Sequence, residues 1–122
     1  VRCQPAHLLG IADGDYLTPK IKRLLQVFKQ DLETLYGKRL AGLVLYGSFA
    51  RHEETEGSDI DVLVVLKGDV SPVEEIWRMG DVGTKRLMED GELISIVPTS
   101  QDNFLYRDSP LLQNVRQEGI LV

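Results

Sequence analysis

The sequence predicts an α+β (α/β) domain in which a small mixed sheet is flanked by helices. Three observations support this fold class: an amphipathic helical pattern comes first, short runs rich in valine and leucine follow it, and further helical patterns lie between and after those runs. The 122 residues are 43% hydrophobic and 27% charged, as in one ordinary globular domain. We expect residues 18–122 to form this domain and residues 1–17 to form an N-terminal extension.

Two long helices are expected from their capping signals and apolar spacing. The first begins at Thr18-Pro19, where a hydroxyl can cap free amides and proline fits the first helical position, and it ends at Gly37. The second begins at its cap, Ser71, and ends near Asp90-Gly91. The apolar residues of this second helix are Val73, Ile76, Trp77 and Leu87. We therefore expect this face, with its tryptophan, to pack in the core.

Strands are expected at three apolar runs, which cover residues 43–46, 60–66 and 92–97. The first two are continuous apolar runs and are expected to be buried on both faces of the sheet. Residues 98–100 are expected to form a turn, and a helix with a break near Asp108-Ser109-Pro110 should follow them. The last helical segment is expected to end before Gly119.

Charge, cysteine content and hydropathy argue against several classes of function. Fourteen basic and 19 acidic residues give a net charge of −5, which argues against non-specific binding to nucleic acid. The single Cys3 and the scattered His7 and His52 cannot assemble a zinc cluster or an intramolecular disulfide, so a reducing, cytoplasmic location is expected. No apolar run is long enough for a transmembrane helix, so no membrane association is expected.

The segment that carries chemical information combines Tyr46-Gly47-Ser48 with Ser58-Asp59-Ile60-Asp61, and both parts lie at strand ends. Because alternate side chains of a strand share a face, Asp59 and Asp61 are expected to point the same way and to hold a hard cation between them. Mg²⁺ takes one or two protein carboxylates and leaves positions for phosphate oxygens. The pair therefore predicts a metal together with a phosphate ligand.

Gly47 and Ser48 supply the complementary half of the predicted site. A glycine at the end of a strand lets the backbone approach a phosphate closely, and the helix that follows offers free N–H groups. The Ser48 hydroxyl and the Arg51 guanidinium are further candidate phosphate contacts. Either half alone is common in turns and strand edges, but the two at this spacing are expected by chance on the order of once in a thousand chains of this length.

This combination resembles the nucleotidyltransferase superfamily typified by DNA polymerase β, and most closely its minimal stand-alone members, the MNT proteins. The resemblance covers about residues 17–122 and implies the nucleotidyltransferase fold. In that family the Gly-Ser turn cradles the triphosphate of ATP or another nucleotide, and the Asp-x-Asp pair binds two catalytic Mg²⁺ ions. The resemblance places nucleotide binding on Gly47 and Ser48, and metal binding and catalysis on Asp59 and Asp61. Arg51 and Ser58 are further candidate nucleotide-binding residues.

The family's full catalytic set includes a third carboxylate on a later strand, which commonly serves as base and as ligand of the second metal. By register Ser95 occupies that position here, and Glu92 is the only carboxylate of residues 91–97. Glu92 needs a bulge or a different register to reach the same face of the strand, and it is the candidate third catalytic acid. Activity therefore depends on whether Glu92, Ser95 or a partner residue takes this role.

The resemblance implies a Mg²⁺-dependent enzyme that transfers a nucleoside monophosphate, AMP from ATP, to a hydroxyl acceptor with release of pyrophosphate. Minimal members of the family are commonly paired with an all-helical HEPN protein in toxin–antitoxin modules, which implies a HEPN-type partner with a tyrosine acceptor. Two alternatives remain open: a non-catalytic antitoxin that neutralises by binding, and a small-molecule transferase of the aminoglycoside type. The second is disfavoured because 122 residues cannot accommodate the extra domain that such enzymes need.

Overall fold

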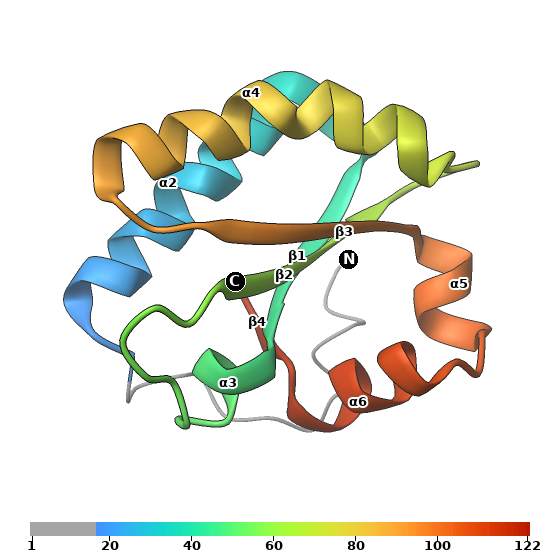
Figure 1. The fold of residues 1–122 in the computed structure, drawn as a ribbon. Coiled ribbons are helices and arrows are strands. Elements are labelled where there is room, and N and C mark those ends of the chain that lie inside the picture. The colour runs from blue at the N-terminus through green and yellow to red at the C-terminus, as the bar shows by residue number, and fades with distance from the viewer. Residues whose placement is uncertain (1–16) are drawn as a thin grey trace.

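The computed structural model describes residues 17–122, so Cys3, His7 and nearly all of the expected extension lie outside the described part of the chain. The helical elements are α2 (Pro19–Tyr36), the 3₁₀ turn η1 (Gly37–Arg39), α3 (Gly47–Ala50), α4 (Pro72–Asp90), α5 (Gln101–Tyr106) and α6 (Pro110–Glu118). The strands are β1 (Leu40–Tyr46), β2 (Ile60–Leu66), β3 (Ile94–Ser100) and β4 (Ile120–Leu121). Helices flank a mixed sheet, as the sequence predicts (Figure 1).

The four strands of the described residues form one sheet in the order β3-β2-β1-β4. Strand β1 is antiparallel to β2 and β4, whereas β2 and β3 are parallel. Helices α2 and α4 cover one face of the sheet, and α5 and α6 cover the other (Figure 1). The two central strands are therefore buried on both faces, which is why their sequences are continuous apolar runs and not alternating ones.

Alternate side chains of the central strands enter two separate parts of the core. Toward α2 and α4, the sheet buries Leu43, Leu45, Val62 and Val64 against Ile21, Leu24, Leu25, Phe28 and Leu32. Toward α5 and α6, it buries Val44, Leu63 and Val65 against Phe104, Leu112 and Val115. None of the helices in residues 17–122 is both long and apolar enough to cross a membrane.

Helix α2 forms as its sequence predicts. The backbone N–H of Ile21 donates to the hydroxyl of Thr18 over 3.2 Å, so the cap satisfies one of the free amides of the first turn. Gly37 has a positive φ of 57° and its N–H donates to the carbonyl of Glu33, which ends the helix. The break predicted in the C-terminal helical region is also confirmed, because α5 and α6 are separate helices.

Helix α4 has the expected extent but buries a different face. The expected apolar face is exposed: Val73 retains 66% of its accessible surface, Ile76 51%, Trp77 82% and Leu87 41%. The residues that α4 buries instead are Glu75, Met79 and Arg86. Both charged residues meet oppositely charged groups on α2 and η1, and these ion pairs hold the polar side of the helix against the protein. Ser71 precedes the helix, but its side chain makes no capping hydrogen bond within the described residues.

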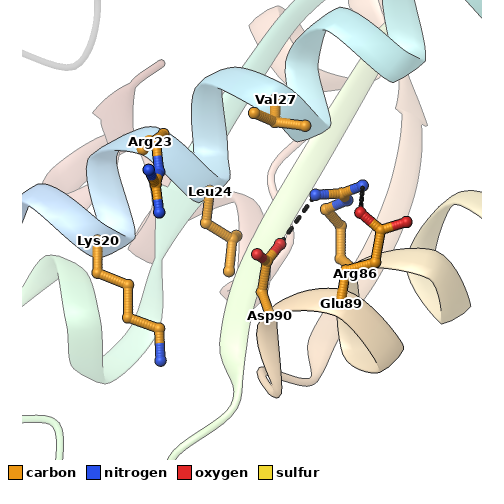
Figure 2. A pocket seen from close by; sticks show the side chains of 7 residues that line it. All are labelled: Lys20, Arg23, Leu24, Val27, Arg86, Glu89 and Asp90. Carbon is orange, nitrogen blue, oxygen red and sulfur yellow. Dashed lines mark hydrogen bonds and ion pairs between the residues drawn. The ribbon is translucent and has the colours of Figure 1, made fainter.

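A polar pocket of about 240 Å³ lies between the start of α2 and the end of α4. Arg86 lines it and donates from Nη1 to Asp90 over 2.9 Å and from Nη2 to Glu89 over 3.2 Å, as Figure 2 shows. Its Nε lies 3.5 Å from Asp31 Oδ2 on α2. Three carboxylates thus surround one buried guanidinium, so this pocket is part of the packing between the two helices.

Strand β3 differs in extent from the expected third strand, and β4 was not expected. Residues 98–100 form part of β3 and not a turn, whereas Glu92 lies before the strand. Proline is tolerated inside β3 because this strand is at the edge of the sheet, where one side of its backbone has no partner strand among the described residues. Strand β4 has only two residues, too few to give a sequence signal of its own.

Candidate functional site

The turn between β1 and α3 brings the backbone of Gly47 against the carboxylate of Asp61. Gly47 has a φ of 76°, which a glycine adopts without strain. A Cβ built at this position would overlap with Asp61 Oδ2. The contact follows from the register of the sheet, in which Tyr46 pairs with Asp61 across β1 and β2. The glycine of the Gly-Ser motif is therefore required by the position of the second carboxylate of the Asp-x-Asp motif.

The two aspartates lie at the N-terminal end of β2 and outside the apolar core. Asp59 is exposed just before the strand, and Asp61 is half-buried as its second residue. Ile60, between them, is fully buried and points into the core. This alternation is what the sequence predicts for a strand whose acidic side chains share one face.

The negative charges of Asp59 and Asp61 repel each other. The pKa of Asp61 is raised above its usual value by partial burial, then by the negative charge of Asp59, with a smaller contribution from Glu118, while Arg51 opposes the shift. Burial raises the pKa of Tyr46 as well, and the charges of Asp61 and Glu118 add to that shift. The site therefore favours the approach of a cation, which would relieve the repulsion.

Glu118 belongs to this site although sequence reasoning did not single it out. Its Oε2 accepts a hydrogen bond from the backbone N–H of Gly47 over 2.8 Å and another from Arg51 Nη1 over 2.9 Å. The same guanidinium donates from Nε to Glu53 over 2.8 Å. The hydrogen bonds from Arg51 to Glu53 and to Glu118 raise the pKa of Arg51 above its usual value.

The position of Glu118 depends on the end of α6 and on β4. Gly119 follows it in a tight place, because a Cβ there would lie 2.5 Å from the carbonyl oxygen of Val115 and 2.7 Å from a methyl group of Val44. Ile120 then pairs with Leu45 of β1. The available sequence signal was a helix stop followed by the three apolar residues 120–122, a run too short to identify a strand.

The two serines of the motif occupy different environments. Ser48 is half-buried in the first turn of α3, next to Gly47, and its carbonyl oxygen accepts a hydrogen bond from the N–H of Glu53 over 2.8 Å. The hydroxyl of Ser58 accepts a hydrogen bond from the N–H of Thr55 over 2.9 Å, so it closes the turn that precedes the aspartates. Ser48 thus lies at the Gly47 turn itself, and Ser58 shapes the loop that leads to Asp59.

The two candidates for the third acid lie apart from each other. Ser95 is the parallel-sheet neighbour of Asp61, as the register argument predicts. Glu92 lies before β3 and forms an ion pair with Lys20 of α2 over 3.2 Å. The position beside the aspartate pair is thus held by a hydroxyl, and the carboxylate of Glu92 is directed to the start of α2.

The aspartate pair fits a Mg²⁺ ion that arrives with a phosphate ligand. Within residues 17–122, no three acidic, histidine or cysteine side chains are arranged to hold a metal ion by themselves. Mg²⁺ binds typically through one or two carboxylates and completes its coordination with phosphate oxygens and water. Asp59 and Asp61 supply two such carboxylates, and the repulsion that raises the pKa of Asp61 would be compensated by the ion.

The fold and these side chains together define a class of protein. A mixed sheet presents, at neighbouring strand ends, a glycine turn, a guanidinium directly after the short helix that follows, and two carboxylates at the start of the adjacent strand. Such an arrangement combines donors for a phosphate with ligands for its counter-ion. These are the parts that a protein needs to bind and position a phosphorylated nucleotide.

Comparisons with known proteins identify that class. Residues 21–102 match the family described as "Nucleotidyltransferase domain". A relative from Methanocaldococcus jannaschii named "putative protein adenylyltransferase" is 33% identical over 99 residues, which are 80% of this chain and 93% of the relative. A second relative with the same name and organism is 38% identical over 76 residues, which are 62% of this chain and 76% of that protein.

A solved structure extends the comparison to the fold. The crystal structure of a "putative nucleotidyltransferase" from Sulfolobus solfataricus superimposes with a TM-score of 0.54 over 86% of each chain, at 15% sequence identity. The chain therefore belongs to the nucleotidyltransferase domain family and is an enzyme of the nucleotidyltransferase type. The matched range includes Gly47, Asp59 and Asp61 and ends before Glu118.

Proposed function

We propose that the chain transfers AMP from ATP to a hydroxyl group of a protein acceptor, with Mg²⁺ as the metal and pyrophosphate as the leaving group. The observation that carries this proposal is the contact between the Gly47 turn and the carboxylate of Asp61. This contact brings the predicted phosphate-binding backbone next to the predicted metal ligand. The name of the M. jannaschii relatives supports a protein as the acceptor.

In this proposal the residues of the turn hold the triphosphate. The N-terminal turn of α3 and the Ser48 hydroxyl would donate to phosphate oxygens, and Arg51 would neutralise their charge. Ser58 would support binding by fixing the loop before the aspartates. Because these groups are held on a strand end and a short helix, they position the nucleotide without a large rearrangement, and positioning is a large part of catalysis in this class of reaction.

Asp59 and Asp61 would hold one or two Mg²⁺ ions at the phosphates. When bound, the metal would neutralise the pyrophosphate and lower the pKa of the acceptor hydroxyl. Two residues are candidates for the role of the third acid. Ser95 lies beside Asp61 in the sheet but has no carboxylate, whereas Glu92 has a carboxylate but pairs with Lys20. General-base assistance is typically worth about 10²–10⁴-fold in rate, so a chain without it would be a slow enzyme and not an inert one.

We propose a HEPN-type helical protein as the partner that carries the acceptor tyrosine. The support is the resemblance of the Gly-Ser and Asp-x-Asp motifs to those of minimal family members, which are commonly paired with such a protein. A non-catalytic antitoxin is the second candidate function, because a serine lies at the position of the third acid. A non-catalytic antitoxin is expected to bind its partner in the absence of nucleotide and to transfer no AMP to it.

A transfer assay distinguishes these functions. The chain is incubated with ATP labelled on its α-phosphate, with Mg²⁺ and with the protein product of the neighbouring gene. We expect the label on a tyrosine of that product, and no label when the chain carries Asp59→Asn together with Asp61→Asn. Tight binding of the product without any transfer would instead support the non-catalytic antitoxin.

A second assay tests the third acid. Ser95→Asp should raise the transfer rate if that position lacks only a base, and Glu92→Gln should lower it if Glu92 has taken over the role. If neither variant changes a measurable rate, the base lies outside residues 92–95.

A further inference from the structure

Glu118 contacts two residues of the site, Gly47 and Arg51, from which it is separated by 71 and 67 positions in the sequence. One oxygen of its carboxylate, Oε2, accepts from the backbone N–H of Gly47 and from Arg51 Nη1, at 2.8 and 2.9 Å. Both donors belong to the turn and helix that the proposed function assigns to the triphosphate. The side chain of Glu118 is only 21% exposed, so these charge-assisted hydrogen bonds are partly shielded from water.

The carboxylate is itself held in place by the fold. Its backbone lies at the last residue of α6, where the N–H of the following Gly119 donates to Val115 over 2.7 Å, and the chain then enters β4 and pairs with β1. Strand β1 also carries the Gly47 turn at its end. The acceptor and its two donors are therefore attached to the same rigid pair of strands.

Arg51 would be poorly oriented without these contacts. Its side chain retains 45% of its accessible surface, and a free arginine side chain at such a position samples many rotamers. Glu118 binds Nη1 and Glu53 binds Nε, so the plane of the guanidinium is fixed. Among residues 17–122, no hydrogen-bond acceptor occupies Nη2, which can then face a ligand. A guanidinium oriented in advance loses less entropy when it binds a phosphate.

We propose that Glu118 is a positioning residue of the nucleotide site, which holds the Gly47 turn and orients Arg51 toward the triphosphate. This inference rests on the proposed function, because it assigns Glu118 a role in binding the nucleotide of that reaction. It also extends the site beyond residues 21–102, the range that matches the family. Glu118 touches neither metal nor reacting atoms in this role; it acts through its two donors.

Two substitutions separate the two contacts. Glu118→Gln keeps an oxygen that can accept from Gly47 but removes the charge that holds Arg51, whereas Glu118→Ala removes both contacts. We expect Glu118→Gln to raise the Kd of MgATP roughly five- to twentyfold, as expected for loss of one charge-assisted hydrogen bond, with Glu118→Ala larger still. Glu56→Gln, in the exposed loop before the aspartates, removes the same charge and should leave the Kd unchanged.

A double-mutant cycle shows whether the effect passes through Arg51. In the Arg51→Ala background, Glu118→Gln should change the Kd of MgATP by less than about twofold, because the group that it orients is gone. Full additivity of the two substitutions would overturn the proposal. Tighter binding of MgATP by Glu118→Gln would also overturn it, because the carboxylate would then compete with the phosphates for the same donors.

A measurement without nucleotide keeps this inference separate from the proposed function. Amide hydrogen exchange of Gly47, followed by NMR, should accelerate roughly tenfold or more in Glu118→Ala but not in Glu56→Gln, because the amide loses its acceptor. Unchanged exchange would refute the positioning contact whatever the nucleotide result. If the wild type binds no MgATP, the proposed function is refuted. If Glu118→Ala nevertheless shows accelerated exchange of the Gly47 amide, the contact between Glu118 and Gly47 is still confirmed.

Discussion

Gly47 has little freedom to change. Its φ is positive, and the Asp61 carboxylate occupies the space that a Cβ would need. We expect Gly47→Ala to lower the free energy of unfolding by about 2–4 kcal/mol, from left-handed strain and overpacking together, and to abolish nucleotide binding. Chemical denaturation and a binding titration measure the two effects.

Gly68 provides the matched control for this substitution. Its φ is 80°, close to that of Gly47, but apart from its chain neighbours no atom of residues 17–122 lies within 4 Å of the position of its Cβ. Gly68→Ala should therefore cost only the backbone strain, about 1–2 kcal/mol, and leave nucleotide binding intact. Equal losses in the two variants would contradict the close contact between Gly47 and Asp61.

Glu75 gives a second prediction at the scale of single residues. This carboxylate is 2% exposed and accepts hydrogen bonds from Tyr36, Arg39 and Arg78 over 2.7, 3.0 and 3.0 Å. Burial raises its pKa, but the hydrogen bonds and the two positive charges outweigh burial, so the pKa lies below the ordinary value of 4.5. Its stabilising contribution is thus complete above about pH 4.5 and is lost as the pH falls through the lower folded value.

The measurement is urea denaturation of the wild type and of Glu75→Gln between pH 7 and pH 3. We expect the substitution to cost about 2–4 kcal/mol at pH 7, because it leaves cationic donors without their charged acceptor. The difference between the two proteins should shrink as the pH falls below about 4.5, because the unfolded chain then binds a proton at Glu75 more readily than the folded protein does. A constant difference across this range would show that the charge of Glu75 does not contribute.

At the scale of elements, α4 presents the clearest departure from expectation. Trp77 is the single tryptophan of the chain and retains 82% of its accessible surface. We expect its fluorescence to have the emission maximum of indole in water and to be quenched freely by acrylamide, with little change when the protein is unfolded in urea. A blue-shifted emission that moves to longer wavelength on unfolding would contradict the exposed position.

The sequence predicts the extent of elements better than the faces that they bury. Capping signals located α2 and α4 correctly, and continuous apolar runs identified β1 and β2 as central strands. The buried face of α4 could not be predicted, because apolar spacing cannot show that Glu75 and Arg86 find partners on η1 and α2. The extent of β3 was missed because proline usually signals a turn, and only an edge position permits it in a strand.

In the candidate site, too, the sequence predicts some residues and misses one. Its motif residues are close in sequence, so local spacing alone predicts that Gly47 and the aspartates lie together at neighbouring strand ends. Glu118 was missed because it reaches Gly47 from 71 residues away through a pairing of only two residues in β4. Contacts of that kind depend on tertiary packing and leave no periodic pattern in the sequence.

At the scale of the whole molecule, the pairing of β4 couples stability to the site. Ile120 is 5% exposed, packs in the core on the α2 side and pairs with Leu45. We expect Ile120→Ala to lower the free energy of unfolding by about 2–5 kcal/mol and also to weaken MgATP binding, because Glu118 loses its anchor. The control is Leu32→Ala, which truncates a buried side chain of α2 in the same part of the core and leaves α6 and β4 unchanged.

The two variants should differ in function although both lose stability. Leu32→Ala should keep its affinity for MgATP at temperatures where it remains folded, and Ile120→Ala should not. Isothermal titration at low temperature, with circular dichroism to verify folding, makes the comparison. Equal affinities in the two variants would show that β4 supports the fold without supporting the site.

The late position of Glu118 in the chain also has a consequence during synthesis. A protein leaves the ribosome from its N-terminus, so β1, α3 and β2 emerge while α6 and β4 have not yet been made. The hydrogen bonds from the Gly47 amide and from the Arg51 guanidinium to Glu118 cannot form until residue 118 has been synthesised and has left the ribosome. A nascent chain can thus contain Gly47 and the aspartate pair and still lack the carboxylate that completes the proposed nucleotide site.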